Sequence, residues 1–249
     1  MKKSILLLIM PFLIAFHCNG QTIDDCAFCS EELLTEEQLS DKGLEELSML
    51  RNEIYARKGY LFSNNLYQYY FENQHWYKLA NSNDDVKLSD IETKNVALLK
   101  SLENKSQKKR DAAIRDLKKL KKAINNNDES TIDKFIHKMK SVDDYESYDN
   151  LLQRLKETLN YINLNEIGWN KGKGIYGISI DNGYKIYGYK ITFGANRVVI
   201  ETGDYSHSEI FGDFNDGYSD YMSESEYVYF WIFEMQEEGI VFEMFIVAG

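Results

Sequence analysis

The chain has 249 residues, of which 43% are hydrophobic and 28% charged, and its formal net charge is −11. This length allows one or two hydrophobic cores. The acidic balance argues against nucleic acid as a partner of the whole protein, because phosphate backbones bind cationic surfaces. Aromatic residues make up 14% of the chain, and 18 of them are tyrosines, which suit interfaces as well as cores.

The chain begins with the features of a secretory signal peptide over residues 1–20. A basic "MKK" precedes the apolar run SILLLIMPFLIAF, which has the length of a signal-peptide core rather than of a membrane span. Cleavage after Gly20 would free a mature chain beginning at Gln21, whereas lipidation of Cys18 would anchor the protein to a membrane. The bulky His17 favours cleavage. Both routes export the protein, so we expect a periplasmic or extracellular location, or alternatively an outer-membrane lipoprotein.

Loss of residues 1–20 would leave 27 Lys and Arg against 40 Asp and Glu, a net charge of −13. Two cysteines, Cys26 and Cys29, then remain in a tail of residues 21–32. A cysteine pair in an exported chain most often forms a disulfide. A redox pair would need a strand before Cys26 and a helix beginning there, and a zinc site would need a second ligand pair. The sequence offers neither, so we expect a disulfide, no metal and no cofactor.

Residues 33–103 have the pattern of a small helical domain. Two capping boxes, Thr35 with Gln38 and Ser89 with Glu92, predict helix starts. Between them, apolar residues recur at helical spacing up to a glycine that suits the left-handed conformation after a last turn. These residues are Leu47, Leu50, Ile54 and Gly59.

Residues 104–249 read as charged helices followed by an antiparallel sheet. Between Lys105 and Lys122 nine Lys and Arg stand against two Asp, a pattern typical of a solvated helix face. From about Ile167 the period changes to two, and Asn182-Gly183 between β-rich runs predicts a hairpin. Along residues 227–235 both alternating faces are apolar, which predicts a central strand covered on both sides. The fold class expected for the whole chain is α+β.

Four short motifs follow one another along residues 33–103: an "LTEE" entry, "LRNEIYARKGY", "LYQYYFENQHWY" and a closing "ETKNVALL" helix. In this order they resemble the YARHG domain, an extracellular bacterial module of unknown function. The resemblance implies export but no activity or ligand. Lys58 stands where the family has His, so a histidine role in metal binding or proton transfer does not carry over. The helices and sheet of residues 108–249 are loosely similar to the cone-shaped NTF2-like fold.

The first candidate site is the aromatic cluster of the helical domain. Helical spacing sends Arg51 and Arg57 to different sides, and dense aromatics in a small domain more often form a core. Exposed rings beside Arg57 would instead stack on a glycan or clamp an envelope polymer or peptide. The residues expected to bind are Tyr55, Arg57 and Trp76.

No reaction is indicated by the remaining motifs. The histidines lack HExxH spacing and no G-x-S-x-G occurs. "GDFNDGYSD", residues 212–220, resembles a calcium loop, but Gly217 falls where the third ligand belongs. If Glu234 and Glu243 lay inside a cone, their carboxyl groups could take part in a reaction. Two outward-facing carboxylates are the simpler interpretation. We therefore expect a non-catalytic binding protein of the cell envelope with an unknown ligand or protein partner; the alternative is a small-ligand-binding or hydrolytic protein with its site in the C-terminal cone.

Overall fold

The structure, a computed structural model, describes residues 25–137, 139, 146–170, 172–183, 185–206 and 226–248. The expected signal peptide with Cys18, and the calcium-like stretch 212–220, lie outside these residues. The helices are α1 (Leu44–Ala56), α2 (Asn65–Glu72), α3 (Asp90–Asn125), α4 (Glu129–Ile136) and α5 (Tyr148–Tyr161), with a short 3-10 turn η1 (Asn83–Asp85). The strands are β1 (Gly168–Asn170), β2 (Lys173–Asp181), β3 (Lys185–Phe193), β4 (Arg197–Ser206), β5 (Glu226–Met235) and β6 (Ile240–Ala248). Helices followed by an antiparallel sheet confirm the α+β prediction.

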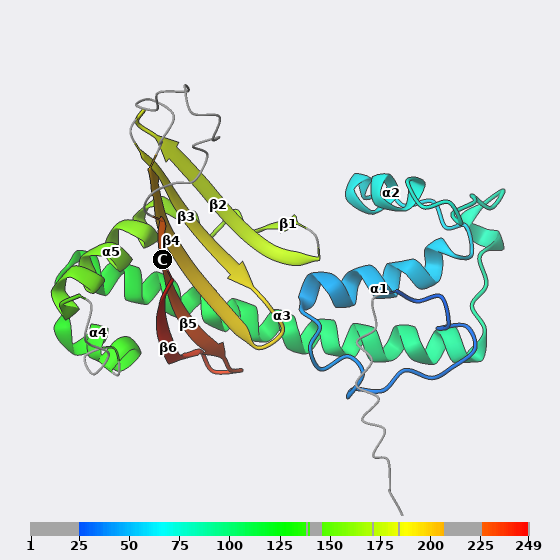
Figure 1. The fold of residues 1–249 in the computed structure, drawn as a ribbon. Helices are drawn as coiled ribbons and strands as arrows, with labels where there is room; N and C mark the ends of the chain where they lie inside the picture. Colours follow the sequence, from blue (N-terminus) through cyan, green and yellow to red (C-terminus); the bar gives the residue numbers. More distant parts are fainter. Residues whose placement is uncertain are drawn as a thin grey trace, which may run out of the picture.

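The long helix α3 runs beneath both halves of the molecule (Figure 1). At 1.5 Å per residue its 36 residues span about 54 Å. Its start is fixed by the predicted capping box, because Ser89 accepts from the Glu92 N–H at 3.2 Å and Glu92 accepts from the Ser89 N–H at 2.8 Å. The expected boundary between residues 103 and 104 falls inside this unbroken helix, so both halves are built on one rigid element.

The segment that carries the first capping box differs from the prediction. Thr35 and Gln38 do exchange the expected bonds, with the Thr35 N–H donating to Gln38 Oε1 at 2.9 Å, yet the chain makes only turns there. The next helix, α1, begins directly after Gly43, and a helix confined to the few residues before it gains few backbone hydrogen bonds for the cost of nucleation. The capping bonds therefore stabilise a turn.

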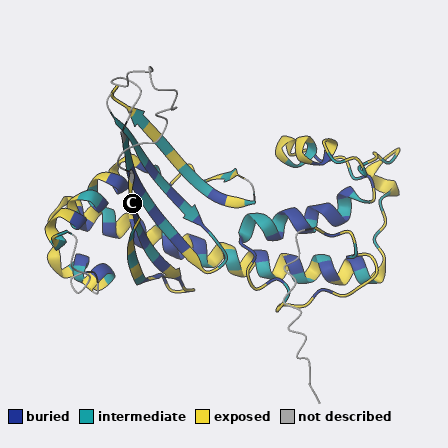
Figure 2. Cartoon of the chain, viewed as in Figure 1, coloured by how far each residue is buried: buried dark blue, intermediate teal, exposed yellow. Residues whose placement is uncertain are grey.

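The six strands form one sheet in the order β1-β2-β3-β4-β5-β6, with every neighbouring pair antiparallel. The predicted hairpin joins β2 to β3, with Gly183 at φ +84°. Side chains of one face pack on α3, α4 and α5, and the largest of them, Trp231 and Phe193, are fully buried. We call this the inner face, and Figure 2 shows its burial.

The opposite, outer face differs from the prediction for residues 227–235. Strand β5 has a strand on each side, but among the described residues helices cover only its inner face. Phe230 and Ile232 on the outer face are partly exposed, as are Met244 and Ile246 opposite them on β6. The doubly apolar pattern therefore marks a sheet whose outer face keeps apolar side chains at its surface.

The N-terminal half has two small cores. One contains the predicted disulfide, Cys26–Cys29, which is fully buried beside Leu50 and Leu99. Asn95 of α3 fastens this segment, since its side chain accepts from the Leu34 N–H at 2.8 Å and donates to the Cys29 carbonyl at 2.9 Å. The other core is aromatic and centres on Phe71 of α2. Among the described residues, no helix has both the length and the apolar composition needed to cross a membrane.

A buried ion pair joins the two halves. Arg110 of α3 donates two hydrogen bonds to the carboxylate of Glu45 of α1, and the bond from Nη2 to Oε2 is 2.5 Å long. Strand β2 passes directly over the pair, because a Cβ on Gly174 would lie 2.6 Å from the Arg110 guanidinium. Trp169 of β1 also meets the Tyr70 ring of α2, with centroids 6.0 Å apart. The sheet is therefore docked on the helical half through close polar and aromatic contacts.

Candidate functional site

The structure brings two of the three expected binding residues into direct contact. Arg57 lies just past the end of α1, and its guanidinium stands 4.2 Å from the centre of the Trp76 ring, a cation–π distance. Arg57 also donates to the Glu53 carboxylate at 2.5 and 2.8 Å. Burial raises the pKa of Glu53, an effect that the bond from Arg57 partly offsets. The arginine is thus held between a ring and a buried acid.

Tyr55, the third residue expected to bind, packs against the aromatic core that centres on Phe71. Its ring packs edge-on against Tyr60 at 5.8 Å, and Tyr60 contacts Phe62 in the same manner at 5.0 Å. The Tyr77 hydroxyl donates to the Tyr60 carbonyl at 2.7 Å, which fixes the loop after Gly59. The rings of Tyr55, Tyr60 and Tyr77 are partly buried, so they belong to the aromatic core.

Gly59 and Lys58 each have a structural task. Gly59 has φ +83°, and a Cβ there would lie 2.5 Å from backbone atoms of Lys78 and Ala80, so a side chain cannot fit. Lys58, at the family's histidine position, pairs with the buried Glu92 at 2.9 Å. The lysine therefore anchors the start of α3.

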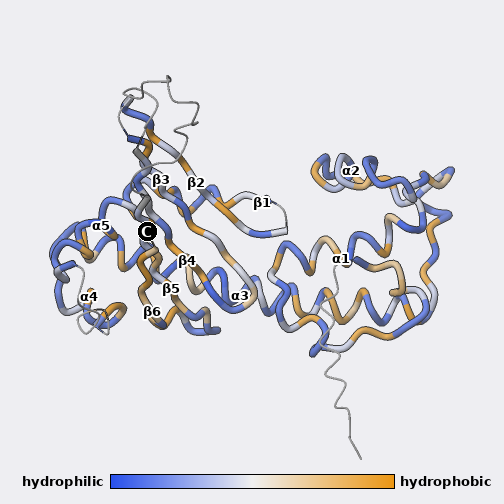
Figure 3. Tube along the Cα trace, viewed as in Figure 1, coloured by the Kyte–Doolittle hydropathy of each residue, from blue (hydrophilic) through white to orange (hydrophobic). Residues whose placement is uncertain are grey.

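Five exposed apolar side chains of the helical half lie on α2 or within a few residues of it, where Figure 3 shows hydrophobic segments alternating with polar ones; Leu33, 54% exposed, lies outside this stretch. Tyr69 is 74% exposed, and Leu61 and Leu79 are more than half exposed. We call this group the α2 surface; its members are Leu61, Leu66, Tyr69, Tyr70 and Leu79. Exposed apolar side chains gathered in one segment of the chain are candidates for an interaction site.

Glu234 and Glu243 lie on the outer face of the sheet, not inside a cone. Glu234 is exposed and stands opposite Arg197 in the register. Glu243 accepts a two-pronged contact from Arg197, with Nε at 2.7 Å. Both acids are therefore surface carboxylates beside an arginine, as the simpler interpretation had it.

A pocket of about 240 Å³ opens on the inner face of the sheet, beside α5. We call it the sheet pocket; it is lined by Arg154, Glu157, Lys185, Tyr187, Tyr189, Thr202, Gly203, Asp204 and Tyr229. The Tyr189 hydroxyl donates to Glu157 at 2.6 Å, and burial together with that carboxylate raises the pKa of Tyr189. Lys185 donates to Asp204 at 2.6 Å, which raises the pKa of Lys185.

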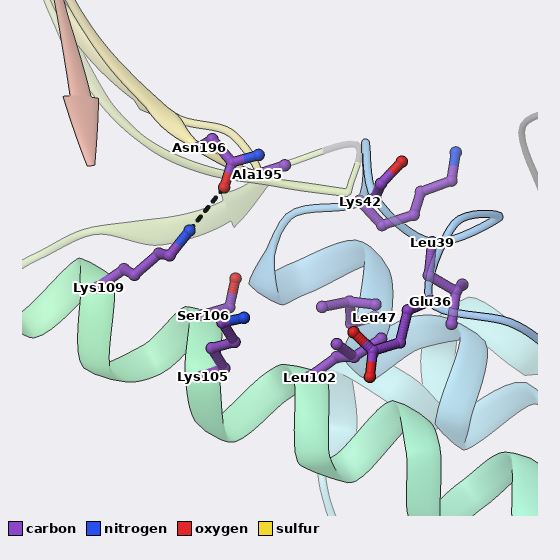
Figure 4. A pocket seen from close by; sticks show the side chains of 11 residues that line it. Glu36, Leu39, Lys42, Leu47, Leu102, Lys105, Ser106, Lys109, Ala195 and Asn196 are labelled. Atoms are coloured by element: carbon purple, nitrogen blue, oxygen red, sulfur yellow. Dashed lines mark hydrogen bonds between the residues drawn. The ribbon is translucent and has the colours of Figure 1, made fainter. Parts of the chain in front are cut away.

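A second cavity of about 180 Å³ lies where the two halves meet. Figure 4 shows Lys105, Ser106 and Lys109 along α3, with Lys109 reaching across to Asn196 at 2.7 Å. Leu39, Leu47 and Leu102 form much of its remaining wall. The lysine–asparagine bond ties the β3–β4 turn to α3, so this cavity is part of the junction between the halves.

Sequence reasoning missed the α2 surface and the sheet pocket. The aromatic density around residues 66–77 indicated a cluster, but the exposure of Tyr69 against the burial of Phe71 depends on which side of α2 meets α1. The pocket brings α5 together with β3, β4 and β5. Among the described residues, no group of three or more His, Cys, Asp or Glu could hold a metal ion.

Comparison with protein families finds the YARHG domain at residues 26–104. The match covers the disulfide, α1, α2 and the first part of α3. No curated protein and no solved structure matches the chain.

Proposed function

We propose that this chain, which carries a YARHG domain at residues 26–104, is an exported, non-catalytic binding protein of the cell envelope that docks a protein partner on its α2 surface. One observation carries the proposal: five large apolar side chains lie exposed within residues 61–79. Tyr70 packs edge-on against the buried Phe71, with ring centroids 5.1 Å apart, so this part of the surface is held in place before a partner binds. The expected signal peptide supports export.

A protein partner is favoured over a lipid surface by charge. The chain carries a net charge of −11, whereas peripheral helices bind anionic membranes through a basic face. Tyrosine is also enriched at protein interfaces, where its ring is apolar and its hydroxyl stays in contact with water.

The proposal is tested by affinity capture with the mature full-length chain. The Tyr69→Ala, Leu79→Ala double variant removes the two most exposed members of the surface. Lys190→Ala, on the outer face of the sheet, serves as control. A single envelope protein retained by the wild type and the control but lost by the double variant supports the proposal. Equal capture by all three proteins, or binding of the wild type to lipid vesicles alone, contradicts it.

A second candidate function is small-ligand binding in the C-terminal half. The sheet pocket is the observation that favours it, because a concave site lined by rings and a few converging polar groups is typical of ligand pockets.

A further inference from the structure

Three of the four charged side chains that line the sheet pocket lie in ion pairs. Lys185 pairs with Asp204 at 2.6 Å, and Arg154 of α5 pairs with Glu146 at 2.9 Å. Glu157, the fourth, accepts from the neutral Tyr189 hydroxyl. A free anion would have to displace a carboxylate from Lys185 or Arg154 and leave that carboxylate unmatched. The electrostatics therefore disfavour an anionic ligand.

These groups retain hydrogen-bonding capacity. An ammonium has three donors and a carboxylate about four acceptor sites, and the Lys185–Asp204 bond uses one of each. The ion pairs also hold their side chains in place, so donors and acceptors of both kinds face the cavity in fixed positions. Such a set of donors and acceptors suits a molecule whose own groups both donate and accept hydrogen bonds, as hydroxyls do.

Tyrosine rings supply the apolar part of the pocket. Tyr187, Tyr189 and Tyr229 line it, and Tyr161 stacks on Tyr189 with centroids 4.3 Å apart. Tyr229 is held from its face by Arg154 at 4.5 Å. A tyrosine combines an apolar ring with a polar tip. A sugar has an apolar C–H face and a rim of hydroxyls. Tyr189 and Tyr229 are almost fully buried, so the partly exposed Tyr187 is the ring that would meet that face.

The volume limits the size of the ligand. About 240 Å³ lies below the range of roughly 300–1,000 Å³ that is typical of pockets for drug-sized molecules. Deeper along the inner face, Ile191, Ile200 and Trp231 fill the core completely, so the pocket is a shallow recess. It has room for one ring.

We propose that the sheet pocket binds one uncharged sugar ring, either as a free monosaccharide or as the end of an envelope glycan. The inference rests on the second candidate function and is independent of docking on the α2 surface. Its ligand class follows from the paired cations, the unused hydrogen-bonding groups, the partly exposed Tyr187 ring and the size of the recess.

Two lysines of β3 provide a matched test. Lys185 and Lys190 are each 40% exposed, and each pairs with a carboxylate of β4, Asp204 at 2.6 Å and Glu201 at 2.5 Å. They lie five positions apart and so on opposite faces of the sheet. Lys185→Ala alters the pocket, whereas Lys190→Ala makes the same chemical change outside it.

The experiment is an NMR titration of the full mature chain with glucose, galactose, N-acetylglucosamine and a short N-acetylglucosamine oligomer. Inorganic phosphate serves as an anionic probe and glycine as a zwitterionic one. We expect saturable shifts at pocket residues with at least one sugar and with neither charged probe. Lys185→Ala should weaken that binding about tenfold or more and Lys190→Ala less than twofold. A response to the oligomer alone would assign the source to a glycan chain.

Absence of saturable binding by every sugar overturns the inference, as does preferential binding of phosphate or glycine. Equal weakening by the two lysine variants would also overturn it, since the sugar would then bind elsewhere. Tyr69→Ala on the α2 surface should leave sugar binding unchanged. Loss of partner capture in that variant with sugar binding intact separates the two functions.

Discussion

Replacing Arg110 by alanine should destabilise the whole chain, because the Arg110–Glu45 pair is the buried link between its two halves. Both side chains are about nine-tenths buried, at 9% and 12% exposure. Arg110→Ala leaves the Glu45 carboxylate buried beneath Gly174 without a counter-charge. Breaking one side of such a pair lowers the free energy of unfolding by about 3–5 kcal/mol.

Arg197 and Glu243 offer a control of the same chemistry at the surface. This pair has the same two-pronged form, but Arg197 is 60% exposed. Arg197→Ala should lower the free energy of unfolding much less than Arg110→Ala does, because water screens the charges of an exposed pair.

Urea denaturation of the full chain, followed by tryptophan fluorescence, measures both variants. With a slope of about 2–3 kcal/mol per M, Arg110→Ala should lower the midpoint by about 1–2 M. Replacing both Arg110 and Glu45 by methionine should recover most of the loss, because no buried charge then remains unpaired. Equal losses for Arg110→Ala and Arg197→Ala, or a double variant as unstable as the single one, would refute the reasoning.

Two further predictions concern the helical half. Gly59→Ala should lower the melting temperature much more than Gly183→Ala does. Both glycines have positive φ, but a new Cβ would lie 2.5 Å from backbone atoms at Gly59 and would have nothing within 4 Å at Gly183. Equal losses in the two variants would mean that the close backbone contact around Gly59 is unimportant. Because burial raises the folded-state pKa of Glu53 above its ordinary 4.5, the wild type should lose stability relative to Glu53→Gln as pH rises from below 4.5 through the raised value. Urea midpoints measured across that range check this, and a constant difference between the two proteins would contradict it.

Features that depend on neighbouring residues were predictable from the sequence. The Ser89–Glu92 capping box, the Asn182-Gly183 hairpin and the Cys26–Cys29 disulfide each form as expected. In each case the partners lie within a few positions, so the local pattern determines the contact.

The continuity of α3 across the expected boundary is not visible in the composition. The change to a basic sequence after residue 103 predicted a boundary, and the family match ends at residue 104, yet no glycine or proline interrupts Asp90–Asn125. A change of surface charge alters the solvated face of a helix without breaking its backbone hydrogen bonds.

The candidate sites depended on contacts that the sequence does not specify. Arg57 and Trp76 meet across 19 positions, and the motif gave both residues but not their contact. The sheet pocket depends on the register of β3, β4 and β5 and on where α5 crosses them. Glu234 and Glu243 lie on the outer face, in line with the simpler interpretation, but their alternation along the strands could not say which face the helices cover.

The most direct test of the account is photo-crosslinking from the α2 surface in living cells. A photoreactive amino acid in place of Tyr69 should yield one discrete crosslinked protein, and the same replacement at Tyr161, an exposed tyrosine on α5, should not. No crosslinked product from position 69, or the same product from both positions, would contradict the claim that the α2 surface is the docking site.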